Sequence, residues 1–263
     1  MHRCFVPPSG WKGSRAELPK AEEHHLLDVL RVRDGETVGL FDGRGREAQG
    51  RVSLVRLAPG VAGPRSVIEI VRELPGTAPR VAVTLAQALL KGRKTDLVVE
   101  KAVELGASSV LPFVSERVIP RLNETQRRER AARWERIALA AAKQCGTSLV
   151  TAVGPVADFG EAVARCSTLD LFLVGSLREG RSPVSRVLHE AHRGGVGSVG
   201  LLIGPEGDLT ESELALAVES GAAPVDLGDR VLRSETAALY GLSVLAYEFF
   251  NGGDSRPARP AGP

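Results

Sequence analysis

The chain has 263 residues, of which 43% are apolar and 25% are charged, a composition typical of globular proteins and a length suited to two domains. No apolar run approaches the roughly 18 residues of a membrane-spanning helix, and the first ten residues lack a secretory apolar stretch, so we expect a cytoplasmic protein with no membrane partner. The net charge of +2 does not by itself indicate nucleic-acid binding. Cys4, Cys145 and Cys166 lack metal-ligand spacing, so no metal site is expected.

Residues 1–74 have the pattern of a small β-barrel domain. Short strands are predicted over Val38–Phe41, Gln49–Leu57 and Ser66–Val71, with a glycine turn after the first. One helix, Ala21–Leu30, interrupts them. Its apolar residues at helical spacing fall on one face: Leu26, Leu27 and Leu30.

The pattern changes after the turn-rich segment 74–79, so we place a second domain at residues 75–250. Strands then alternate with helices, which is typical of an α/β domain with a mainly parallel sheet. The predicted strands are Val81–Ala86, Ser109–Phe113, Leu169–Val174, Val199–Ile203 and Pro224–Leu227. The predicted helices include Thr95–Leu105, Asn123–Gln144 and Glu235–Phe250. The Gly- and Pro-rich tail, residues 251–263, is predicted to be disordered.

Three loops follow predicted buried strands, at 174–176, 203–208 and 227–237. Ligands of open parallel sheets bind beyond the carboxyl ends of the strands, so these loops predict a ligand site. Gly204 and Gly207 allow the backbone to approach a ligand closely. Neither a Rossmann fingerprint nor a P-loop is present. For the loop 203–208 alone, a tight strand-to-helix connection without a ligand is an equal alternative.

Residues at the starts of two predicted helices have local structural explanations, except for one arginine. Thr210 and Glu213 are spaced as a capping box. At the last helix, Ser234 is predicted to be the N-cap, and Glu235 to lie favourably at the positive end of the helix dipole. Arg233 gains nothing from that dipole, so it is the better candidate for a functional role.

The segments Leu202–Gly207, Leu227–Gly228 and Val231–Ala237 resemble the signature of the RsmE family, the 16S rRNA uridine-N3 methyltransferases of the SPOUT superfamily. The resemblance extends from Arg3 to about Phe249. Further matching segments are Lys101–Gly106, Ser115–Arg117, Ala141–Cys145, His24–Leu26 and Val29–Arg31. Asp208 stands where the family usually has a second glycine, and Thr147 where it often has arginine. Because aspartate tolerates left-handed backbone, we expect the loop at Asp208 to keep its shape.

The resemblance implies a fold, a cofactor and an assembly. Residues 1–74 are expected to be a PUA-like RNA-binding barrel, and residues 75–250 a SPOUT domain whose chain forms a trefoil knot near its C-terminus. The protein is expected to be a homodimer that binds S-adenosylmethionine in the knot loops. The implied cofactor-binding residues are Val174, Gly175, Ile203, Gly204, Pro205, Glu206, Gly207, Leu227, Gly228, Val231, Leu232, Thr236 and Ala237.

The implied reaction methylates N3 of a uridine in 16S rRNA of the small ribosomal subunit, near the decoding centre. N3 must lose its proton, and an arginine aimed at the resulting charge would stabilise it. Arg233 and Arg117 are the candidates for this role, and Glu235 is a third catalytic candidate. Glu206 and Glu235 are the possible general bases. The RNA-binding candidates are Arg3, Arg31, Arg33, Arg117 and Arg121.

Three alternatives stay open on the sequence. The first is a SPOUT methyltransferase acting on tRNA or large-subunit rRNA. The second is a non-catalytic RNA-binding module. The third is an α/β protein that holds a phosphate at Gly204–Gly207.

Overall fold

The computed structural model describes residues 1–55, 65–76, 78–117 and 122–250. Arg121, the tail 251–263 and the end of the predicted strand Gln49–Leu57 lie outside these ranges. The chain divides into two compact units, Met1–Ala78 with Ala142–Val150, and Pro79–Ala141 with Thr151–Pro263. Within the described ranges, no helix is long and apolar enough to cross a membrane.

The N-terminal unit is built on a six-stranded sheet with the order β1-β4-β5-β6-β3-β2. β1 pairs with β4 in parallel, and the other pairs are antiparallel. The strands are β1 Arg3–Phe5, β2 Trp11–Lys12, β3 Arg15–Ala16, β4 Thr37–Phe41, β5 Glu47–Leu54 and β6 Ser66–Leu74. The helical segments are the 3₁₀ turn Pro8–Gly10, α1 Lys20–His24 and the π-helical turn His25–Val29.

Alternation along β5 explains how this sheet forms a core. Ala48, Gly50 and Val52 are buried while their neighbours are partly or fully exposed, as expected for a strand with one face on a core. Gly50 is required at the closest approach, because a Cβ there would lie 2.4 Å from Cγ2 of Ile68. The pairing register with β6 shifts at the same point.

The predicted helix Ala21–Leu30 is present, but it changes from α to π form at His25. Its predicted apolar face is confirmed: Leu26 is fully buried, and Leu27 and Leu30 pack against the same core. The three predicted strands are also confirmed as β4, β5 and β6. β6 continues to Leu74, the first residue of the predicted turn-rich segment, because it pairs there with Glu47 of β5.

The second unit contains an eight-stranded sheet in which every strand pair is parallel. The main path has the order β10-β8-β7-β13-β11-β14-β12, and β9 pairs with β8. The strands are β7 Ala82–Ala88, β8 Ser109–Val114, β9 Ala152–Val153, β10 Ala157–Asp158, β11 Leu171–Gly175, β12 Ser182–Pro183, β13 Ser198–Ile203 and β14 Ala223–Asp226. Central β13 is buried at every residue after its first, as a strand covered on both faces must be.

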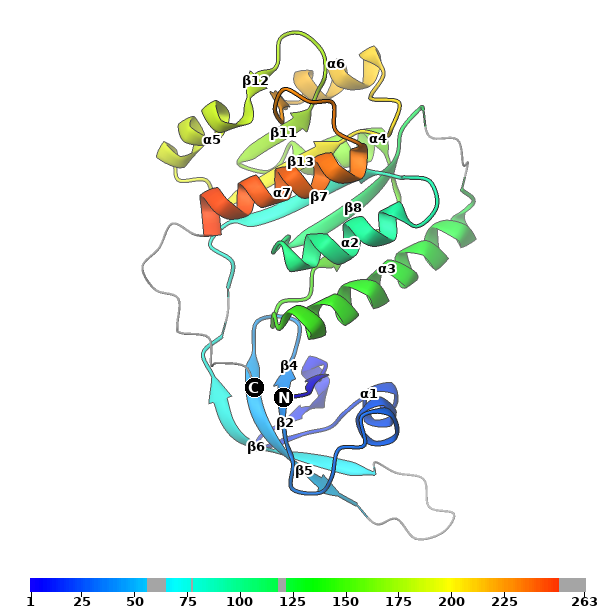
Figure 1. Cartoon of the computed structure of the whole chain (residues 1–263), viewed down its shortest axis with the longest axis vertical. Helices are drawn as coiled ribbons and strands as arrows, with labels where there is room; N and C mark the ends of the chain where they lie inside the picture. The colour runs from blue at the N-terminus through cyan, green and yellow to red at the C-terminus, as the bar shows by residue number, and fades with distance from the viewer. Residues whose placement is uncertain (56–64, 77, 118–121, 251–263) are drawn as a thin grey trace. The chain divides into compact units, whose positions relative to one another are not determined.

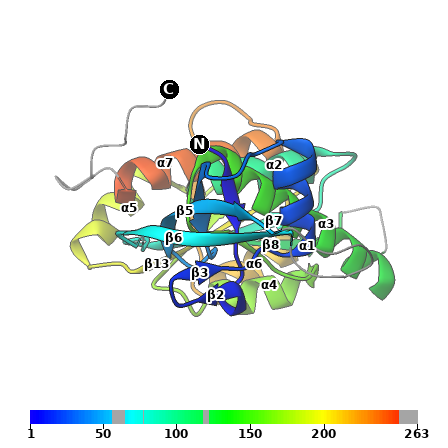
Figure 2. The same ribbon diagram turned by 90° about the horizontal axis from the view of Figure 1, so that it is seen from below.

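Helices cover both faces of this sheet (Figure 1). The helices are α2 Lys94–Glu104, α3 Glu124–Cys145, α4 Phe159–Cys166, α5 Val184–Arg193, α6 Glu211–Glu219 and α7 Ser234–Phe250. α2 and α7 lie together on one side of β7 and β13, and α4 and α6 lie together on the other (Figure 2). This architecture confirms the predicted α/β class, and each strand and helix predicted in this unit is present within two residues of its expected ends.

Capping boxes begin two helices of this unit, and the one at α6 is the predicted Thr210–Glu213 pair. The backbone N–H of Gln126 donates to Oδ1 of Asn123, and the N–H of Asn123 donates back to the Gln126 side chain. Thr210 and Glu213 make the same reciprocal pair at α6. The second pair fixes the direction in which the chain leaves the loop 203–208.

Candidate cofactor site at the carboxyl ends of the central strands

A cavity of about 480 Å³ opens where four neighbouring parallel strands end. β7, β13, β11 and β14 lie side by side and run in the same direction, so the loops that follow them meet at one edge of the sheet. The loops after β11, β13 and β14 are the three loops that the sequence predicts as ligand-binding. Part of each one lines the cavity.

Most of the predicted cofactor residues line this cavity. They are Gly175, Ile203, Gly204, Pro205, Glu206, Leu227, Gly228, Val231, Leu232 and Ala237. Val174 instead lies fully buried in the hydrophobic core beside β13. Gly207 and Thr236 neighbour lining residues without lining the cavity themselves. Of the predicted catalytic residues, only Arg233 lines it.

The cavity wall carries balanced charge. Its cationic side chains are Lys94, Arg181, Arg230 and Arg233, and its anionic side chains are Glu206, Asp208, Asp226 and Asp229. Leucine, isoleucine and valine side chains lie between them. Such a wall suits a ligand that combines charged groups with an apolar body.

Lys94 links two carboxylates at this cavity. Its Nζ lies 3.3 Å from Oε1 of Glu206 and 3.1 Å from Oε1 of Glu235. These contacts, first with Glu235 and then with Glu206, raise the pKa of Lys94. Burial acts to raise the pKa of Glu206, but backbone hydrogen bonds and Lys94 outweigh it, so that pKa is lowered. Glu206 is therefore ionised at neutral pH and a weak base.

Two loop backbones adopt left-handed conformations at the cavity. Asp208, where the family usually has glycine, has a φ of +61°, a left-handed conformation that aspartate tolerates better than most residues. Its carboxylate accepts a hydrogen bond from the N–H of Leu209 at 2.8 Å. Gly228 has a φ of +112°, and a Cβ there would meet no described atom within 4 Å. The backbone at Gly228 therefore faces open space.

Ser234 does not act as the predicted N-cap. It is the first helical residue of α7, it is buried, and its hydroxyl donates to the carbonyl of Gly204 rather than accepting from the helix. The same hydroxyl accepts from Nε2 of Gln87 at 3.0 Å. The prediction was wrong because a tertiary partner, invisible in the local sequence, competes for the hydroxyl. Glu235 does lie in the first turn of α7, as predicted.

Arg117 approaches the cofactor loop from a different strand. It follows β8, and its Nη1 donates to the carbonyl of Gly207. The preceding loop is held by the buried carboxylate of Glu213, which accepts from the hydroxyl of Ser115 at 3.1 Å and from the N–H of Glu116 at 2.9 Å. Arg117 is exposed.

The arginines of the N-terminal unit divide into two kinds. Arg3 is held internally: it pairs with Glu47, donates to the carbonyl of Thr147 at 3.2 Å and lies 5.0 Å from the ring centroid of Phe41. Arg31 and Arg33 are exposed, and Arg31 has a left-handed backbone with a φ of +56°. The second pair is therefore free to meet a partner in solution.

Sequence reasoning overlooked several cavity residues. Lys94 begins α2, directly after the turn 91–93 that follows β7, and the rule that directs attention to strand ends would have found it. Leu177 and Arg181 belong to the loop after β11, which continues beyond the predicted segment 174–176. In the described part of the chain, no group of three or more His, Cys, Asp or Glu side chains is arranged to hold a metal.

Comparison with known proteins agrees with this architecture. Residues 77–246 match the model of the RNA methyltransferase domain, and residues 18–55 match the RNA methyltransferase PUA domain. The chain is 31% identical to ribosomal RNA small subunit methyltransferase E of Bacillus subtilis, over 86% of this chain and 88% of that protein. It is 32% identical to the protein of that name from Synechocystis, over 92% and 76%.

A solved structure is similar over nearly the whole chain. The ribosomal RNA small subunit methyltransferase E of Neisseria gonorrhoeae, bound to S-adenosyl methionine, has a TM-score of 0.81 and 31% identity, over 94% of this chain and 97% of that one. A methyltransferase from Legionella pneumophila, also with its cofactor bound, has a TM-score of 0.80 and 27% identity, over 93% and 96%. The fold and the matches define an RNA methyltransferase with an N-terminal PUA domain. The chain belongs to the RsmE family, ribosomal RNA small subunit methyltransferase E.

Proposed function

We propose that this protein transfers a methyl group from S-adenosylmethionine to N3 of a uridine in 16S rRNA of the small ribosomal subunit, near the decoding centre. The observation that carries the proposal is the cavity formed by three loops that follow parallel strands, two of which contain the family signature. Two solved structures similar to this chain hold S-adenosyl methionine. The match to the PUA domain supports structured RNA as the substrate.

The cavity residues fit the chemistry of the cofactor. The open backbone at Gly228 and the loop around Gly204 allow close approach to adenosine. The balanced charges of the wall suit a sulfonium and an amino acid, and apolar Leu227, Val231 and Leu232 suit the adenine ring. When bound, S-adenosylmethionine supplies an activated methyl group. The protein must position the uridine, accept its N3 proton and stabilise the resulting negative charge.

Arg233 is the residue that we place at the reacting base. Its side chain is exposed at the cavity, and no hydrogen bond or ion pair holds it within the described part of the chain. Once N3 has lost its proton, negative charge spreads onto the two ring carbonyls. A free guanidinium at this position stabilises that charge, as donors do in an oxyanion hole. Arg117 is the second candidate for the same charge.

Glu206 and Glu235 are the candidate proton acceptors. Both are paired with Lys94. Backbone hydrogen bonds and Lys94 lower the pKa of Glu206, which keeps this carboxylate ionised and ready to accept a proton but makes it a weaker base. Because a weak base removes the N3 proton poorly, the rate depends more on stabilisation of the uridine anion. Arg233 is therefore the most important residue in this proposal. Positioning supplies much of the remaining rate.

The RNA surface is proposed to include Arg31, Arg33 and Arg117. All three are exposed and belong to loops. Arg3 has a structural role in addition to any contact with RNA, because three groups of its own unit already hold it. Arg121 is retained as a candidate from the sequence.

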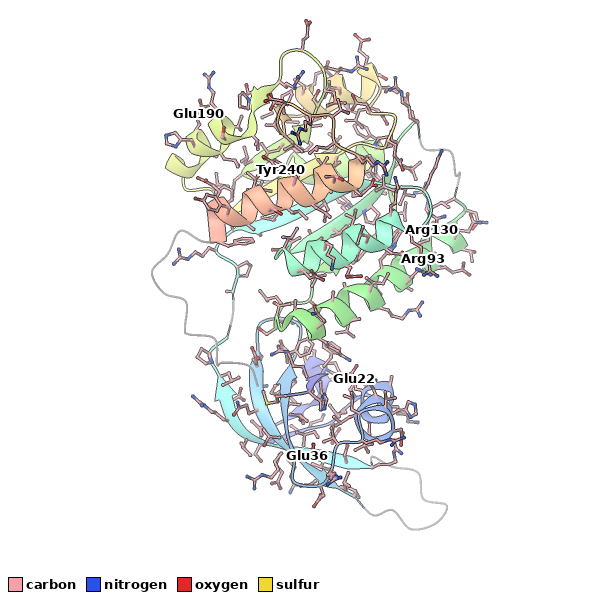
Figure 3. The ribbon with its side chains drawn as sticks, viewed as in Figure 1. Glu22, Glu36, Arg93, Arg130, Glu190 and Tyr240 are labelled. Carbon is pink, nitrogen blue, oxygen red and sulfur yellow. The ribbon has the colours of Figure 1, made fainter. Side chains whose placement is uncertain are left out.

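We further propose a homodimer and a knotted chain. Tyr240 on α7 (Figure 3) is 45% exposed and Tyr247 is 73% exposed, and the two are seven residues apart on one face of the helix. An apolar helical face of this kind suits a second copy of the chain. The return of α7 onto β7 and β13 after the loop 227–233 is compatible with threading of the knot.

One experiment tests the activity. Purified protein, labelled S-adenosylmethionine and small subunits that lack the modification are combined, and the RNA is digested to nucleosides. We expect label in 3-methyluridine from 16S rRNA. Label on a ribose, on cytidine or only in tRNA would exclude the proposed substrate.

A further inference from the structure

Gln87 is a fully buried amide near the end of β7, one strand away from the loop 203–208. Its Nε2 donates two hydrogen bonds of 3.0 Å, to the carbonyl of Ala88 and to the hydroxyl of Ser234. The hydroxyl of Ser234 in turn donates to the carbonyl of Gly204. A chain of hydrogen bonds therefore runs from the sheet, through the start of α7, to the cofactor loop.

Only one end of this series of hydrogen bonds lines the cavity. Ser234 and Gly204 line it, whereas Gln87 does not. Ser234 has a single proton to donate, and Gln87 occupies its acceptor side, so the hydroxyl is left with one orientation, toward Gly204. Gln87 thus fixes a group in the cavity wall without contacting the cavity.

The carbonyl oxygen of the Gln87 amide makes this arrangement unfavourable for folding. Oε1 of Gln87 is buried and has no hydrogen-bond partner among the described residues. Exchanging oxygen and nitrogen would not help, because the oxygen would then face the carbonyl of Ala88. A buried, unpaired acceptor destabilises a fold, and an apolar side chain of the same size avoids that penalty. Stability alone therefore does not explain a glutamine here.

We propose that Gln87 is a positioning residue for the cofactor site: through Ser234 it holds the carbonyl of Gly204 and with it the loop that binds S-adenosylmethionine. The inference rests on the proposed assignment of the cavity to this cofactor. Loss of the Gln87 amide frees the Ser234 hydroxyl to rotate, and the Gly204 carbonyl loses its fixed donor. The loop must then be ordered again each time the cofactor binds, which weakens affinity.

The test compares Gln87→Met with Thr84→Val. Methionine keeps the length of the side chain but removes its donors. Thr84 lies on the same strand, and its hydroxyl pairs with that of Ser109 at 2.8 Å, so its variant also removes one β7 hydrogen bond without touching the cavity. Calorimetric titration gives the dissociation constant for S-adenosylmethionine, and thermal unfolding gives the Tm of each variant.

We expect Gln87→Met to weaken cofactor binding by about 5- to 10-fold, the effect of one hydrogen bond, while its Tm is equal to or above that of the wild type. Thr84→Val should leave affinity within 2-fold. Ser234→Ala should weaken binding similarly, and the double variant with Gln87→Met should be no weaker than Ser234→Ala alone, since both changes break one chain. Ser234→Ala also tests the link if Gln87→Met does not fold.

Two results would overturn the inference, and they have different meanings. If Gln87→Met or Ser234→Ala binds the cofactor as the wild type does while Gly228→Val has lost binding, the cavity assignment stands and the positioning role is wrong. If Gly228→Val also binds normally, the cavity is not the cofactor site and both proposals fall.

Discussion

Replacing Gly228 by valine tests whether the loop after β14 contacts the cofactor. The backbone there has a φ of +112°, and no described atom lies within 4 Å of a Cβ, so the new side chain projects into open space beside the cavity. Strain from the left-handed backbone should destabilise the fold by about 1–3 kcal/mol. Occupation of the space needed by adenosine should reduce affinity at least about 100-fold, equivalent to about 2.8 kcal/mol.

Gly221→Val separates these two effects. Gly221 has a φ of +93° and equally open surroundings, but it lies after α6 and does not line the cavity. Thermal unfolding should show a similar loss of stability in both variants, and calorimetric titration should show lost binding only for Gly228→Val. The reasoning is refuted if both variants bind S-adenosylmethionine alike, whether both normally or both weakly.

The remaining predictions concern catalysis, RNA and assembly. Arg233→Ala should lower turnover by about 10²–10³ with little change in cofactor affinity; an equal loss in both would contradict a role at the uridine. Lys94→Met should raise the pKa of its partner Glu206 and so move the acid limb of the pH–rate profile to higher pH, and an unmoved profile would exclude Glu206 as the base. Arg31→Ala should reduce the slope of log affinity for small subunits against log salt by about one unit, and an unchanged slope would remove it from the RNA surface. Light scattering should show a wild-type dimer at micromolar concentration and a monomer for Tyr247→Glu; a wild-type monomer would refute the dimer.

The fold was predictable wherever local pattern and tertiary structure agree. Buried strands such as β13 appear in the sequence as continuous apolar runs. The spacing of Thr210 and Glu213 predicts the start of α6 because both residues lie within one helical turn. The loops 203–208 and 227–233 were predictable as a site because parallel strands bring their carboxyl ends together.

The residues that the sequence misplaced or missed depend on partners far along the chain. Ser234 bonds to Gly204, thirty positions away, so its local resemblance to an N-cap was misleading. Lys94 meets its carboxylates across more than one hundred residues. Arg3 looked like a free cation because nothing nearby reveals its contacts with Glu47 and Thr147. Spacing rules predict contacts within one helical turn or one strand pair. The partners in these contacts are much farther apart in the sequence.

The segment Ala142–Val150 has a consequence for how the protein can be made and divided. It belongs to the N-terminal unit, where Leu149 bridges to Gly43 and the N–H of Val150 donates to the carbonyl of Gly43 at 3.0 Å. The chain thus leaves this unit, returns to it and leaves again. No single cut yields both units whole: a fragment ending near Ala78 lacks part of its own structure. During synthesis, the first unit to begin emerging from the ribosome cannot be completed until Val150, more than half of the 263-residue chain, has been made.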